Sequence, residues 1–172
     1  SDLAIADHFA DCLQRHGLEA RSIEIELTET FAVKFSDQLR RNIDALRQNG
    51  FRLSIDDFGA GYTSVQQIIE YTADTIKLDR ALVSNLTASH SLPVLKALIA
   101  LCHAKDVAVV GEGIDTPEKL SMLTAAGCDL FQGYLISKPL PIEDLAIWAL
   151  TRTARYAHDE ALDEQQSRQA IA

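Results

Sequence analysis

Apolar residues recur along this chain with two alternating spacings. Stretches in which they return every three or four residues predict amphipathic helices, and short stretches that are continuously apolar or alternate with charged residues predict strands. The expected strands cover residues 23–27, 51–55, 75–78, 107–110 and 129–131. The expected helices lie between Asp2 and Gly17 and at residues 34–49, 64–71, 93–105, 117–126 and 142–150. Asp2 and Thr116 are good N-cap residues, and Gly17, Gly50 and Gly127 are expected to end helices.

Strands that alternate with helices predict an α/β fold with parallel strands and crossover helices. Two architectures satisfy this pattern, an open doubly wound sheet and a (β/α)8 barrel. In both, the functional residues lie at the carboxyl ends of the strands. Candidate chemistry is therefore expected at those ends.

The composition of the 172 residues narrows the class of protein. An apolar content of 47% is enough for the core of one domain, and the polar residues 153–172 are expected to form a helical or disordered tail. The net charge of −9 argues against a surface for a nucleic-acid polymer. Three cysteines without a CxxC spacing argue against a disulfide framework or a zinc site, and no apolar run is long enough to span a bilayer. We expect a cytoplasmic protein, either by itself or as the cytoplasmic part of a larger sensor.

Acidic residues gather at the predicted strand ends, together with one lysine and one glutamine. The set is Glu26, Glu29, Asp56, Asp57, Lys77, Asp79, Glu112, Asp115 and Gln132. A single such carboxylate would be explained as a helix N-cap or a solvated loop charge. Because parallel strands bring their ends to one rim, the set is expected to converge, and a metal ion or Lys77 must offset the repulsion. Donors that are all oxygen favour Mg²⁺, Mn²⁺ or Ca²⁺ over zinc or copper, and the adjacent Asp56 and Asp57 could reach two ions, as in phosphoryl chemistry.

The segment LSIDDFGAGYTS at residues 53–64 also matches two other motifs in part. Its glycines resemble a dinucleotide-binding turn, but Ser64 replaces the third glycine, and Asp56 and Asp57 would repel a pyrophosphate unless a cation lay between them. The triplet at residues 57–59 spells the metal-binding motif of protein kinases, but the chain has no glycine-rich nucleotide loop and no HRD catalytic loop. The residues therefore favour neither motif.

Several segments together resemble the EAL-domain cyclic di-GMP phosphodiesterases, whose fold is a (β/α)8, TIM-barrel-like domain. The segments are ELTE at residues 26–29, DDFGAGY at 56–62, IKLD at 76–79, GEGIDT at 111–116, QGY at 132–134 and SKP at 137–139. Their common order and spacing extend the resemblance over nearly all of residues 1 to 150. The resemblance implies hydrolysis of cyclic di-GMP to linear pGpG, with two Mg²⁺ or Mn²⁺ ions in a complete site.

The resemblance also implies a role for each matching residue. Glu26, Asp56 and Asp57 would bind metal ions. Lys77 would hold the attacking water or the phosphate, and Glu112 would act as a general base or orient the water. The supporting residues would be Glu29, which would brace the loop at 58–64, the loop residues Phe58, Gly59 and Gly61, and Asp79, Asp115 and Gln132. Asp115 is one methylene shorter than the glutamate that the family usually has, which weakens its expected hold on the metal site.

The front of the chain departs from the family pattern. The Glu-Ala-Leu strand that names the family, and the asparagine that follows it, have no counterpart before Glu26, and we interpret the EAL at residues 160–162 of the polar tail as a coincidence. Residues 1–152 are therefore expected to be an EAL domain without its N-terminal strands, with about five of the eight strand–helix units.

Two consequences follow for activity and partners. Open sheet edges are expected to pair, in a homodimer or with the missing N-terminal polypeptide. Such a chain is expected to hydrolyse cyclic di-GMP poorly and to hold one metal ion or none. The alternative is a non-catalytic cyclic di-GMP receptor with a degenerate site.

Overall fold

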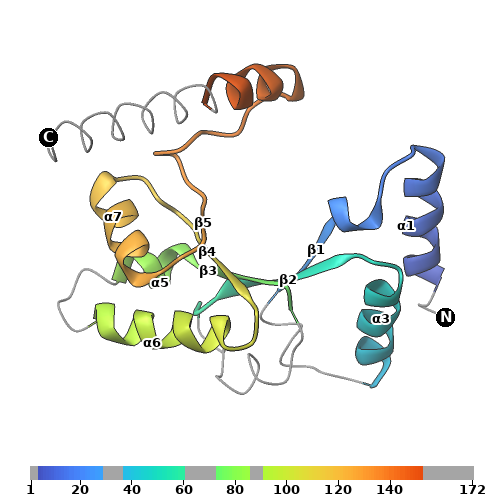
Figure 1. The fold of residues 1–172 in the computed structure, drawn as a ribbon, viewed down its shortest axis with the longest axis horizontal. Helices are drawn as coiled ribbons and strands as arrows, with labels where there is room; N and C mark the ends of the chain where they lie inside the picture. Colours follow the sequence, from blue (N-terminus) through green and yellow to red (C-terminus); the bar gives the residue numbers. More distant parts are fainter. Residues whose placement is uncertain (1–3, 29–36, 61–72, 86–90, 153–172) are drawn as a thin grey trace, which may run out of the picture. The chain divides into compact units, whose positions relative to one another are not determined.

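Five strands form one sheet in the order β1-β2-β3-β4-β5, and each neighbouring pair is parallel (Figure 1). The computed structural model describes residues 4–28, 37–60, 73–85 and 91–152. The strands are β1 (Glu24–Thr28), β2 (Arg52–Phe58), β3 (Thr75–Leu78), β4 (Ala108–Gly111) and β5 (Leu130–Phe131). A doubly wound sheet reverses its strand order at a switch point, whereas these strands follow the chain without a reversal. The order is that of consecutive strands of a barrel.

The helices agree with the sequence pattern in most places. They are α1 (Ala4–Arg15), α3 (Asp37–Gln48), α5 (Arg80–Asn85), α6 (Ser91–His103), α7 (Pro117–Ala126) and a helix at residues 142–152, with a 3-10 turn η1 (Ala20–Ser22). Neither α5 nor η1 was predicted, because six and three residues are too few to show a helical period. The helix expected at residues 64–71 and the N-cap Asp2 lie outside the described residues. None of the helices in the described ranges is long and apolar enough to cross a membrane.

The strand bounds differ from the sequence prediction at one informative place. β3 has the expected bounds, and β1, β4 and β5 begin one residue later than expected. β2 continues to Phe58 instead of ending at Ile55. The two aspartates therefore belong to the strand and not to the loop after it.

The structure divides into two compact units, Ser1–Ile136 and Ser137–Ala172. All five strands belong to the first unit, and the helix at residues 142–152 belongs to the second. The predicted boundary between a domain at 1–152 and a tail at 153–172 stays a prediction, because the tail lies outside the described residues.

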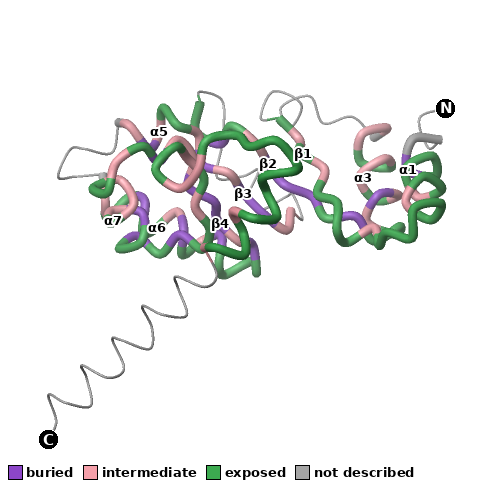
Figure 2. The backbone as a smooth tube through the Cα atoms, turned by 90° about the horizontal axis from the view of Figure 1, so that it is seen from above, coloured by how far each residue is buried: buried purple, intermediate pink, exposed green. Residues whose placement is uncertain are grey.

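The two faces of the strands in the first unit have opposite character. Ile55, Ile76 and Val109 point into the main hydrophobic cluster, where side chains of α6 and α7 such as Ile99 and Leu123 cover them. Figure 2 shows the buried positions along β2, β3 and β4 and on α6. A smaller cluster joins α1 and α3 to the start of β2; its buried members are Ala6, Leu46, Phe51 and Leu53. Since side chains alternate along a strand, the residues between these apolar ones face away from the helices.

The caps of α7 form as the sequence predicted. The Thr116 side chain accepts a hydrogen bond from the Lys119 amide at 3.3 Å, and Pro117 occupies the first turn. Gly127 ends the helix with φ of 99°, a left-handed conformation that glycine adopts without steric cost. The segment at residues 112–116, which the Thr116 cap ends, follows the carboxyl end of β4 directly.

Candidate active site at the carboxyl ends of the strands

The ammonium group of Lys77 on β3 contacts three carboxylates. Its Nζ atom lies 2.8 Å from Glu26 Oε1, 2.9 Å from Asp56 Oδ1 and 2.9 Å from Glu112 Oε1. Glu26 lies on β1, Asp56 lies on β2, and Glu112 directly follows β4. Four neighbouring strands thus contribute one charged side chain each to a single cluster, and the expected convergence is confirmed for these four residues.

The parallel register explains why the four side chains meet. Ile55 pairs with Ile76, so Asp56 and Lys77, which follow them, lie at the same level on the face turned away from the hydrophobic core. Leu78 pairs with Gly111, which brings Glu112 to the same end of the sheet. A slip of one residue in either pairing would turn these side chains to the other face.

Partial burial strengthens the electrostatic contacts of the cluster. The side chain of Lys77 is 11% exposed, and those of Asp56 and Glu112 are 20% and 16% exposed. Burial lowers the pKa of Lys77, but the hydrogen bonds to Glu26, Glu112 and Asp56 outweigh it and raise this pKa above its ordinary value of 10.5. Lys77 is therefore charged throughout the physiological range of pH.

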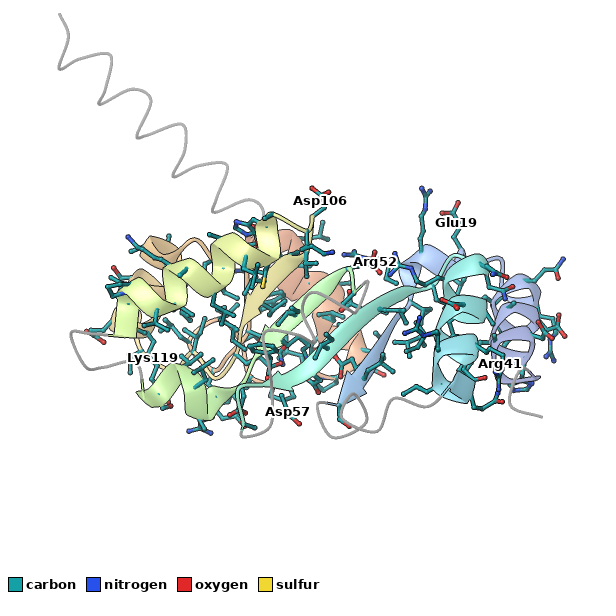
Figure 3. The ribbon with its side chains drawn as sticks, turned by 90° about the horizontal axis from the view of Figure 1, so that it is seen from below. Glu19, Arg41, Arg52, Asp57, Asp106 and Lys119 are labelled. Atoms are coloured by element: carbon teal, nitrogen blue, oxygen red, sulfur yellow. The ribbon has the colours of Figure 1, made fainter. Side chains whose placement is uncertain are left out.

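A β-bulge separates the two adjacent aspartates. Ile55 pairs with Ile76 but Phe58 pairs with Leu78, so β2 has one residue more than β3 between these pairs. The extra residue is accommodated at Asp57, whose φ is 56°, a left-handed conformation that aspartate tolerates better than most residues. Asp56 consequently faces Lys77, while Asp57 is exposed at the end of β2, where Figure 3 labels it.

A cavity of about 280 Å³ lies beside the charged cluster. Its lining residues come from the ends of β3, β4 and β5 and the segments that follow them, and they are Arg80, Glu112, Gly113, Asp115, Gln132, Gly133 and Tyr134. Glu112 belongs to both the cavity and the cluster. Three predicted site residues, Glu112, Asp115 and Gln132, therefore share one cavity.

Asp115 has cationic partners of its own. Its Oδ1 lies 2.7 Å from Lys119 Nζ, and its Oδ2 lies 3.8 Å from a guanidinium nitrogen of Arg80. The hydrogen bond from Lys119 lowers the pKa of Asp115. Sequence reasoning missed Arg80, although its place one residue after the motif at 76–79 could have pointed to it.

Several other predicted supporting residues have structural roles in the fold. The Asp79 carboxylate accepts a hydrogen bond from the Ala81 amide at 2.7 Å and so caps α5. Phe58 is buried in the main hydrophobic cluster, and Gly59 has φ of 96° close to Leu82. Gly133 lies so close to the backbone of Ile114 that a Cβ atom would be 2.1 Å from its carbonyl oxygen. Glu29 and Gly61 lie outside the described residues.

The chemistry of the cluster fits a hard divalent cation. Its donors are all carboxylate oxygens, and three carboxylates with one ammonium give a formal charge of −3 + 1 = −2. In the described ranges, however, no three acidic, histidine or cysteine side chains are grouped closely enough to bind one ion. The assignment of Glu26, Asp56 and Asp57 as metal ligands therefore stays a prediction.

Comparisons with known proteins identify the family of this chain. The family model of the EAL domain matches residues 1–139. The cyclic di-GMP phosphodiesterase NbdA of Pseudomonas aeruginosa is 36% identical over 143 residues, which are 83% of this chain and 18% of NbdA. The chain thus spans less than a fifth of that relative.

Solved structures show the same fold. The EAL domain of Mycobacterium smegmatis DcpA is 32% identical with a TM-score of 0.74, and the match covers 84% of this chain and 65% of that one. BlrP1 of Klebsiella pneumoniae, solved with manganese and cyclic di-GMP, is 35% identical with a TM-score of 0.73, over 77% of this chain and 34% of that one. The five parallel strands match part of a TIM-barrel-like domain, which confirms the predicted fold class. This chain belongs to the EAL domain family.

Proposed function

We propose that this chain carries the strand-end residues of a metal-dependent cyclic di-GMP phosphodiesterase that hydrolyses its substrate to linear pGpG. The observation that supports the proposal is the cluster of Glu26, Asp56 and Glu112 around Lys77. An excess of negative charge at the ends of parallel strands suits divalent cations, through which an anionic phosphodiester can bind. The names of related proteins and the ligands in related structures support cyclic di-GMP as the substrate.

The ligands of the ions would be Glu26, Asp56 and Asp57, with Mg²⁺ or Mn²⁺ as the ions. The bulge at Asp57 supports this assignment: in a regular strand Asp57 would point to the core face, opposite Asp56, whereas the extra residue lets Asp57 stay exposed while Ile55 and Phe58 both face the core. Two such ions, when bound in a complete site, would activate a water molecule and neutralise charge on the phosphate.

Lys77 and Glu112 would handle the water and its proton. In the hydrolysis, the water oxygen bonds to phosphorus, the bond from phosphorus to one ribose 3′ oxygen breaks, and that oxygen takes up a proton. Glu112 lies on both the charged cluster and the cavity, so its carboxylate can accept the proton of the attacking water. The Lys77 ammonium can hold the water or a phosphate oxygen by a charge-assisted hydrogen bond.

The open edges of the sheet lead to a proposal about assembly. β1 and β5 are the edge strands of the described sheet, and Leu130 on β5 is 53% exposed. We propose that these edges pair with a second copy or with polypeptide that completes the domain, since an unpaired edge invites pairing.

The three free cysteines support a reducing, cytoplasmic location.

The proposed function is tested by hydrolysis of cyclic di-GMP in Mg²⁺ or Mn²⁺. We expect a complete EAL domain that contains this chain to form pGpG, and Glu112→Gln to reduce the rate by about 10² or more, as expected for the loss of a general base. The 172-residue chain by itself should be nearly inactive. It has no counterpart of the Glu-Ala-Leu strand and its asparagine, so the attacking water would be misplaced, which costs on the order of 10² in rate.

Glu24→Gln is the matched control. Glu24 lies two residues before Glu26 on β1 but accepts a hydrogen bond from Thr75 at 2.9 Å, away from Lys77. Its substitution should leave turnover unchanged. A complete domain that binds cyclic di-GMP without hydrolysing it would favour the receptor function instead.

A further inference from the structure

The Lys77 ammonium occupies the point at which the three carboxylates converge. Each of its contacts to Glu26, Asp56 and Glu112 is between 2.8 and 2.9 Å, so the charged group is held from three sides. The Lys77 side chain is 11% exposed, which leaves it little room for water as an alternative partner. Lys77 therefore acts here as the cation of the cluster.

Removing this cation would leave like charges together in a partly buried place. Asp56 and Glu112, at 20% and 16% exposure, are the more buried pair of carboxylates, and Glu26 is half exposed. Like charges at this spacing destabilise a fold unless a cation or a proton compensates them. Without Lys77, the metal-free site would depend on protonation or on movement of the strand ends.

We propose that Lys77 is a built-in substitute for a divalent ion, holding the carboxylates in place while no metal is bound and giving way when one binds. This inference rests on the proposed function, because Glu26 and Asp56 are its proposed metal ligands. The arrangement in the described residues supports it: the carboxylates are grouped around the ammonium, and no three of the possible ligands are gathered for a metal.

A metal-free double-mutant cycle tests the first half of the proposal. In EDTA, Lys77→Met should lower the denaturation midpoint of the 172-residue chain, and Lys77→Arg should restore most of it. Glu26→Gln should lower the midpoint or leave it unchanged in the original chain, because it removes an ion pair. In the Lys77→Met background the same Glu26→Gln change should raise the midpoint, because it then removes a repulsion.

The deciding result is that the effect of Glu26→Gln on the denaturation midpoint changes sign between the two backgrounds. Glu24→Gln is the control. Glu24→Gln should have the same effect in both backgrounds, since Glu24 contacts Thr75 and Arg52 and not Lys77. If the Lys77→Met chain fails to fold in EDTA, the double variant should recover folding. Equal effects of Glu26→Gln in both backgrounds, or no recovery, would overturn the proposal.

Titration with Mg²⁺ and Mn²⁺ tests the second half. Removal of a unit charge about 4 Å from a divalent ion should lower the apparent Kd by a factor on the order of 30, even at the dielectric constant of water. Lys77→Met should therefore show a larger rise in melting temperature with metal than the original chain. Equal rises in melting temperature for the variant and the original chain would overturn the proposal that Lys77 takes the place of a metal ion. They would not affect the proposed function. The absence of any rise in either would contradict the proposed metal site itself.

Discussion

Asp129 shows how one side chain joins several elements of this fold. Its Oδ2 accepts a hydrogen bond from the Val109 amide at 2.7 Å and lies 2.9 Å from His103 Nε2. The residue precedes β5, while Val109 lies on β4 and His103 ends α6. Burial raises the pKa of Asp129, but the hydrogen bonds from Val109 and His103 outweigh it, and the pKa is lowered below 3.8.

This lowered pKa predicts a specific loss of stability in acid. Because the folded-state pKa lies below the unfolded value of 3.8, the stabilisation is present above that value and disappears as the pH falls through the folded pKa. Asp129→Asn should therefore lower the free energy of unfolding at pH 7 and reduce its slope against pH below about pH 4. Urea denaturation from pH 7 to pH 3 measures both. An unchanged slope in the variant would contradict the assignment.

At the scale of the element, α6 shows how a helix is oriented by its apolar side. Leu95 is 2% exposed in the main hydrophobic cluster, whereas its neighbour Val94 is 69% exposed. Adjacent residues of a helix point about 100° apart, so Leu95 faces the core while Val94 faces solvent on the same helix.

Truncation of Leu95 and of Val94 to alanine should reduce the stability of the chain by very different amounts. Leu95→Ala should destabilise the chain by about 2–5 kcal/mol, because it removes buried methyl groups and leaves a cavity. Val94→Ala should change stability by about 0.5 kcal/mol or less, as surface substitutions do. Chemical denaturation of both variants provides the measurement. Similar costs for the two would mean that α6 packs with another face toward the sheet.

The bounds of the strands show how far the hydrophobic pattern predicts each element. The apolar residues of β4 form a short continuous run, those of β3 alternate with Thr75 and Lys77, and both strands lie within one residue of their predicted bounds. The bulge in β2 could not be predicted, because it depends on the pairing of Phe58 with Leu78, 20 residues away. α5 was missed as well, since the Asp79 cap becomes visible when its contact with the Ala81 amide is known.

At the scale of the whole molecule, the strand ends should link metal binding to stability. The proposed ligands on β1 and β2 would connect separate strands, so a bound ion would stabilise the folded chain over the unfolded one. We expect Mg²⁺ or Mn²⁺ at about 100 times its Kd to stabilise the chain by about 2.7 kcal/mol and to raise its melting temperature.

Asp56→Asn should abolish this rise. Asp106→Asn is the matched control, because Asp106 lies before β4, at the end of the sheet opposite Asp57 (Figure 3). Thermal unfolding with each metal measures the response. A rise with Zn²⁺ alone, or an undiminished rise in the Asp56 variant, would contradict a hard-cation site of carboxylates.

The sequence by itself determined the α/β alternation, the residues at the strand ends and the family. These features are local: hydrophobic spacing reports the faces of each element, and the motif residues follow directly on their strands. It also named Glu26, Asp56, Lys77 and Glu112 as site residues, because parallel strands bring their carboxyl ends together whatever the details of packing.

The tertiary structure alone decided which of these side chains touch. Lys77 is 51 residues from Glu26 and 21 from Asp56, so their contacts depend on the register between strands and not on local pattern. The same applies to the contact of Asp115 with Arg80, which lies on α5, whereas its partner Lys119 is only four residues away in the sequence. The cation at the centre of the cluster was left open between a metal and Lys77, and the register of β2 against β3 places Lys77 there. Charge balance among distant residues is a property of the assembled sheet, because each Coulomb energy depends on a distance that only folding defines.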